Sequence, residues 1–127
     1  MRQTLAAPAG GFDSPLPGLF AGDPPARFLS LLDEMAGDVR RESMRTALRV
    51  MAATDQRDLL PRIAVPTLLI WGELDARSPL SIARQFEQAI DGAKLVVLPG
   101  AGHMSNLEQP EQFNAAVREF CRAHSPR

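Results

Sequence analysis

Residues 67–98, TLLIWGELDARSPLSIARQFEQAIDGAKLVVL, contain the pattern that decides the fold. The apolar runs at 67–71 and 94–98 are short and uninterrupted, which is typical of strands covered on both faces of a parallel sheet. Between them, apolar residues recur at helical spacing from Ile82 to Ile90, behind a Ser-Pro start. Strand, helix and strand in this order predict a βαβ unit with parallel strands and a right-handed crossover.

The chain ahead of this unit is expected to contain loops and helices but no strand. Residues 1–22 are interrupted by prolines and glycines, which predicts a loop. Apolar residues recur at helical spacing over about 24–36 and 38–53, so we expect two amphipathic helices, with Asp38 as the cap of the second. Residues 54–63 predict at most one short helical turn. The first half of the chain is therefore expected to be helical, and the second half α/β.

One more helix is expected after the unit. Pro110 suits the first turn of a helix that reaches about residue 123 and buries Phe113 and Phe120. This helix and the one at 79–90 should cover the two faces of the strand pair, because both faces of each strand are apolar.

The composition excludes several classes of partner and location. A net charge of −1 gives no reason to expect a nucleic acid or an anionic membrane as partner. No apolar run approaches the roughly 20 residues of a membrane span, and the first residues do not resemble a signal peptide. The single cysteine, Cys121, fits a reducing compartment, so we expect a cytoplasmic location. The two histidines lie far apart without a ligand cluster, so we expect no metal and no organic cofactor.

Two loops leave the carboxyl ends of the expected strands, where parallel sheets bind their ligands. The loop at 72–79 carries Asp75, and the loop at 99–106 carries His103. Neighbouring strands lie about 4.8 Å apart, so the carboxylate is expected to reach the imidazole and to hold one ring nitrogen protonated. Glu73 is a nearby alternative for the acid.

PRIAVPTLLIWGELDARSP (61–79) and AKLVVLPGAGHMSNLEQPEQFNAAVREF (93–120) resemble the C-terminal third of an α/β-hydrolase. The likeness is to the lactonase, esterase and peptidase branch of that family. There, the Asp of a G-x-x-D loop and the His of a G-x-G-H loop are the acid and base of a Ser-Asp-His triad. Asp75 and His103 occupy these positions in the same chain order.

The resemblance implies a partial α/β-hydrolase fold, with its last two parallel strands and their flanking helices. Residues 1–60 would be a partial helical cap, and residues 61–127 the C-terminal βαβα portion of the core. The expected substrate is a small ester, lactone or related acyl compound. Trp71 and Met104, which adjoin the two loops, are expected to contact it.

The chain departs from the family at its nucleophile. No G-x-S-x-G motif occurs, and the upstream oxyanion loop is absent as well. The serines are Ser14, Ser30, Ser43, Ser78, Ser81, Ser105 and Ser125. Removing a triad nucleophile lowers turnover by about 10⁶-fold, so we expect a fragment that carries acid and base but is inactive alone.

Two alternatives stay open: a non-catalytic remnant or assembly module, and one chain of a split hydrolase. A partial domain also leaves the edge of its 67–71 strand unpaired. Leaving three large apolar side chains of the cap helices in water forfeits on the order of 5–8 kcal/mol, comparable to a domain's net stability. Self-association, or pairing with a missing N-terminal half, is therefore expected.

Overall fold

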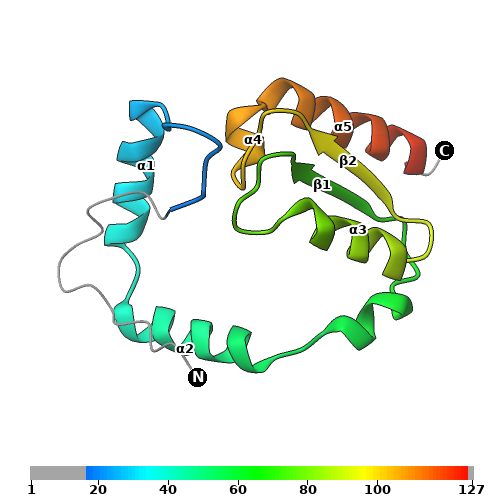
Figure 1. Ribbon diagram of the computed structural model, residues 1–127, viewed down its shortest axis with the longest axis horizontal. Helices are drawn as coiled ribbons and strands as arrows, with labels where there is room; N and C mark the ends of the chain where they lie inside the picture. The colour runs from blue at the N-terminus through cyan, green and yellow to red at the C-terminus, as the bar shows by residue number, and fades with distance from the viewer. Residues whose placement is uncertain (1–16, 126–127) are drawn as a thin grey trace.

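The computed structural model describes residues 17–125. They form a two-stranded sheet with flanking helices and an extended helical arm, which consists of the two helices within residues 26–53 (Figure 1). In chain order the elements are α1 (Ala26–Gly37), α2 (Arg41–Ala53), the 3-10 helix η1 (Arg57–Arg62), β1 (Leu68–Gly72), α3 (Leu80–Ala89), β2 (Lys94–Leu98), α4 (Ser105–Glu108) and α5 (Pro110–His124). All of these elements except α4 were predicted from the sequence. The loop predicted for the first sixteen residues lies outside the described part of the chain.

The strands β1 and β2 are parallel, as predicted. Their register pairs Leu68 with Lys94 at one end and Gly72 with Leu98 at the other. Helix α3 makes the crossover between them. Both strands therefore end at the same edge of the sheet, and the loops that follow them start side by side.

Helices α3 and α5 cover the strand pair. Each contacts both strands, and Figure 1 shows them on opposite sides of the sheet. Ala83 of α3 is buried, as is Ile90, the first residue after that helix. Leu98, at the end of β2, is buried as well. The predicted cover on each face is confirmed. The expectation that α5 buries Phe113 and Phe120 is wrong, because both residues are only half-buried and no residue of α5 is fully buried.

Helices α1 and α2 extend away from the sheet (Figure 1). No residue of α2 is buried, and its residues Leu48 and Met51 are 57% and 71% exposed. The expected cap at Asp38 is wrong: Arg40 is the N-cap residue, and it makes no side-chain capping hydrogen bond. The amphipathic pattern thus forms the helix but leaves its apolar face in solvent.

Candidate active site

Asp75 lies in the loop after β1, where its side chain closes a turn. Its Oδ1 accepts hydrogen bonds from the backbone N–H groups of Arg77 (2.9 Å) and Ser78 (2.8 Å). This turn leads directly into α3, and short polar side chains often stabilise such turns. The turn uses one carboxylate oxygen and leaves the second, Oδ2, free to face the neighbouring loop.

His103 lies in the loop after β2 and meets that second oxygen. Its Nδ1 is 2.9 Å from Oδ2 of Asp75, which confirms the contact expected from the strand order. The Asp75 side chain is 5% exposed and the His103 side chain 42% exposed. The pair is therefore anchored in the protein on the acid side and open to solvent on the imidazole side.

The environment of Asp75 sets its charge. Burial on its own would raise the pKa of this carboxyl, but hydrogen bonds from the Ser78 N–H, the His103 ring and the Arg77 N–H outweigh it, and the pKa is lowered. Asp75 is then an ionised carboxylate near neutral pH, which only accepts hydrogen bonds. The proton of the contact must sit on Nδ1 of His103, and Nε2 of the neutral ring keeps a free lone pair.

Three hydrogen bonds join the loop after β1 to the last residue of β2 and to the loop that follows it. The N–H of Glu73 donates to Leu98 O (3.0 Å), and the N–H of Leu74 donates to Ala101 O (2.8 Å). Glu73 Oε2 accepts the N–H of Gly100 (3.0 Å). Glu73, the alternative acid, therefore ties the loops together, and the carboxylate that bonds to His103 is that of Asp75.

Glycines permit the close approach of the two loops. A Cβ at Gly72 would lie 2.1 Å from the Gly102 carbonyl oxygen, and a Cβ at Gly102 would lie 2.5 Å from the Ala21 nitrogen. Gly100 has a φ of +69°, a left-handed conformation that glycine adopts readily. Gly102 does not have a positive φ, and its lack of a side chain permits close packing instead.

Trp71 and Met104 are both held by contacts within the protein. The Trp71 indole N–H donates to Ser78 O (2.7 Å), and its ring lies against Phe86 with centroids 6.2 Å apart. The Met104 N–H donates to Leu19 O (2.8 Å), and the Met104 side chain is half-buried. Contact of either side chain with substrate stays a prediction.

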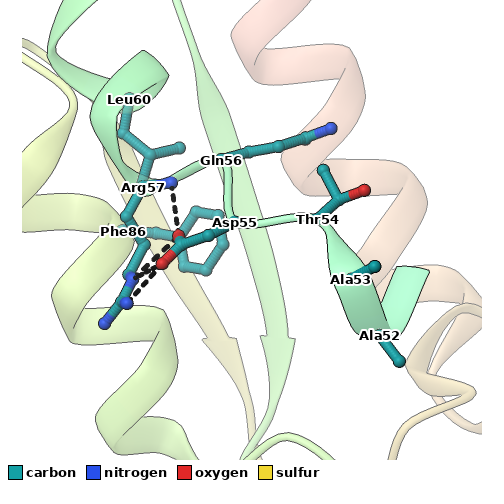
Figure 2. Close-up of a pocket in the computed structure, with 8 residues that line it drawn as sticks. All are labelled: Ala52, Ala53, Thr54, Asp55, Gln56, Arg57, Leu60 and Phe86. Carbon is teal, nitrogen blue, oxygen red and sulfur yellow. Dashed lines mark hydrogen bonds and ion pairs between the residues drawn. The ribbon is translucent and has the colours of Figure 1, made fainter. Parts of the chain in front are cut away.

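A separate hollow lies where the end of α2, η1 and α3 meet, with Asp55 and Arg57 paired in it (Figure 2). Hydrogen bonds from Arg57 lower the pKa of Asp55 to about 2. The lining residues are Ala52, Ala53, Thr54, Asp55, Gln56, Arg57, Leu60 and Phe86. None of them comes from the two loops that carry Asp75 and His103, so this hollow does not include the acid–imidazole pair.

Two parts of the site were not predicted from the sequence. Glu108, at the end of the unpredicted α4, bonds to the loop of His103 and to Ala21. Residues 19–21, which the sequence predicts only as loop, lie against the same turn. The contact between Ala21 and Glu108 has no local signal, because these residues are 87 positions apart in the chain.

Within residues 17–125 there is no group of three or more His, Cys, Asp or Glu side chains that could hold a metal ion. The helices of the same part of the chain are all too short or too polar to cross a bilayer.

Comparisons with known proteins relate this geometry to one family. The sequence profile of the "Alpha/beta hydrolase family" matches residues 1–116. The esterase of Exiguobacterium antarcticum has a similar structure, with a TM-score of 0.77 and 25% identity, over 82% of this chain and 39% of that one.

Curated relatives match over a part of their length. The chain is 32% identical over 90 residues to a pimeloyl-(acyl-carrier protein) methyl ester esterase of Neisseria meningitidis, covering 71% of this chain and 35% of the relative. It is 36% identical over 115 residues to the dihydrolipoyllysine-residue acetyltransferase component of the acetoin cleaving system of Pseudomonas putida, covering 84% and 29%. The chain thus spans about a third of the length of these relatives.

Proposed function

The chain belongs to the alpha/beta hydrolase family, and we propose that Asp75 and His103 are the acid and the base of a triad that hydrolyses an ester. The observation that supports this assignment is the 2.9 Å contact between Asp75 Oδ2 and His103 Nδ1 at the carboxyl ends of two adjacent parallel strands. Burial of the acid and exposure of the imidazole suit a base that must face a substrate.

The two residues would act in sequence. Nε2 of His103 takes the proton of the nucleophile's hydroxyl as the oxygen attacks the ester carbonyl, and an acyl-enzyme forms as His103 returns the proton to the leaving alkoxide. Water then attacks the acyl-enzyme by the same route. Asp75 holds the Nδ1 proton and stabilises the imidazolium in both steps.

The nucleophile and the oxyanion donors are proposed to come from residues other than these 127. None of the serines lies in a G-x-S-x-G motif, the context that exposes the nucleophile in this family. The chain would then supply the acid–base pair and a part of the cap to a larger assembly, either as one stretch of a longer polypeptide or as one of two chains.

An ester is preferred among acyl substrates because the names of two relatives specify ester chemistry. The relative from Neisseria meningitidis is a methyl ester esterase, and the structural neighbour from Exiguobacterium antarcticum is an esterase. Lactones remain within the same chemistry, since hydrolysis of a lactone breaks the same acyl–oxygen bond.

A chimera tests the assignment. The 127 residues replace the matching part of the Exiguobacterium antarcticum esterase, which supplies the remaining chain. We expect the chimera to hydrolyse p-nitrophenyl acetate, and His103→Ala to lower kcat by about 10⁶-fold. The matched control is His124→Ala, on the C-terminal helix, which should leave kcat unchanged. Activity that survives His103→Ala would contradict the assignment, and a folded but inactive chimera would favour the non-catalytic remnant.

A further inference from the structure

Glu108 holds two distant backbone segments with one carboxylate. Its Oε2 accepts the N–H of Gly102 (2.7 Å), the residue before His103. Its Oε1 accepts the N–H of Ala21 (2.8 Å), which is 87 residues away in the chain. Both partners are donors, so the site requires two acceptor oxygens, which an ionised carboxylate provides.

A second contact holds the same distant segment on the other side of the imidazole. The N–H of Met104, the residue after His103, donates to Leu19 O (2.8 Å). Leu19 is itself buried. Residues 19–21 therefore bond directly to Met104, just after His103, and are linked through Glu108 to Gly102, just before it. Together these contacts fix the backbone of the turn that carries the imidazole.

The packing at this contact is tight. A Cβ at Gly102 would lie 2.7 Å from the Phe20 carbonyl carbon and 3.1 Å from Glu108 Oε2. The backbone of residues 19–21 thus lies directly against that of the His103 turn, with no space between them for a side chain. A displacement of either segment is transmitted to the other.

Residues 19–21 are in turn connected to the helical arm. The Phe20 ring stacks on Phe28 of α1, with centroids 6.2 Å apart and the ring planes within 14°. A continuous set of contacts therefore runs from α1 through Phe20 and Ala21 to Glu108, and from Glu108 to the turn of His103.

We propose that Glu108 is a positioning residue, which fixes the His103 turn and couples its position to that of α1. Its catalytic consequence rests on the proposed function of His103. Its structural role does not, because the two hydrogen bonds can be measured without any activity.

Glu108→Gln is the informative substitution. Glutamine has nearly the same shape, but its amide offers one acceptor oxygen and places an NH₂ group against the other N–H donor. One of the Ala21 and Gly102 amides is then left without a partner. Glu111→Gln is the matched control, since Glu111 is an exposed carboxylate in the first turn of α5.

Amide hydrogen exchange in the 127-residue chain tests the contact. We expect Glu108→Gln to speed exchange at Ala21 and Gly102 by about 10- to 100-fold, as for the loss of a hydrogen bond to a charged group. Exchange should not change at Leu69 of β1, which pairs with Leu95, or at Val96 of β2, which pairs with Ile70. The control should alter neither set. The proposal would be overturned if Glu108→Gln left exchange at Ala21 and Gly102 unchanged. It would also be overturned if exchange at these residues were already fast in the unsubstituted chain, or if the strands lost protection to the same extent.

A spectroscopic signature distinguishes positioning from simple stabilisation. We expect the Nδ1 proton that His103 donates to Asp75 to give a downfield NMR resonance, whose position depends on the alignment of the two groups. We expect Glu108→Gln to broaden or shift this resonance, and Glu111→Gln to preserve it. A resonance that Glu108→Gln leaves unchanged would contradict the positioning role. Loss of kcat in the chimera with His103→Ala tests the proposed function separately.

Discussion

Oδ2 of Asp75 lies 2.9 Å from Nδ1 of His103, although 28 residues separate them in the chain. The other oxygen of Asp75 is fixed by the N–H groups of Arg77 and Ser78. These two hydrogen bonds therefore orient the carboxylate independently of its contact with the imidazole ring. An acid held in this way keeps the imidazole in one tautomer, which is the property that a general base needs.

Asp75→Asn should change the tautomer of His103. The asparagine oxygen can still accept the N–H groups of Arg77 and Ser78, but its NH₂ then faces Nδ1 and favours the proton on Nε2. We expect ¹⁵N NMR of the chain to show that the His103 proton lies on Nε2 in the variant and no longer on Nδ1. We also expect kcat of the chimera to fall by about 10⁴-fold. His124, whose Nδ1 contacts Phe120 O, is the internal control and should keep its tautomer. An unaltered His103 tautomer would contradict the role of Asp75.

Asp75 should also make the free energy of unfolding of the chain depend on pH in the acid range. Its pKa is lowered in the folded state, so the unfolded chain takes up this proton first as pH falls. The contribution of Asp75 is present above the unfolded value of 3.8 and is lost as pH decreases through the lower folded value. Urea unfolding between pH 2 and 6 should show a steeper loss of stability in the unsubstituted chain than in Asp75→Asn. If the free energy of unfolding decreased with pH equally in the unsubstituted chain and in Asp75→Asn, this linkage would be refuted.

Gly72→Ala should destabilise the junction of the two loops. The added Cβ would lie 2.1 Å from the Gly102 carbonyl oxygen, and backbone on both sides must move to relieve the overlap. We expect the free energy of unfolding to fall by roughly 1–3 kcal/mol. Gly22→Ala is the control, because a Cβ there meets no atom within 4 Å. Equal urea midpoints for the two variants would count against this close packing.

The isolated chain should self-associate through its exposed apolar surfaces. Leu48 and Met51 of α2 stand in solvent, and β1 has no strand on its outer edge among the described residues. Light scattering should show species larger than 13.8 kDa, and Leu48→Lys with Met51→Lys should reduce them. A monodisperse monomer with a sharp cooperative melt would exclude this behaviour.

Without a partner that provides the nucleophile, the chain should not hydrolyse esters. We expect the turnover of p-nitrophenyl acetate by the pure chain to stay at the background rate, and His103→Ala to leave that rate unchanged. Turnover that His103→Ala abolishes would show that the 127 residues contain their own nucleophile, and would overturn the proposed division of the triad.

The sequence by itself determined the parts of the fold that depend on near neighbours. The two apolar runs specified the strands, helical spacing specified the long helices, and the positions of Asp75 and His103 after parallel strands placed them at one edge. These features follow from short-range periodicity and from the geometry of a βαβ unit, so they can be read from composition and spacing.

Only the tertiary structure decided which groups meet between distant segments. It joined Asp75 rather than Glu73 to the imidazole, and it placed Ala21 on Glu108 across 87 residues. It also packed Gly102 against the backbone of Phe20 and Ala21. The physical reason is that such contacts depend on how whole segments pack, and the spacing of apolar residues along one segment carries no information about its distant neighbours.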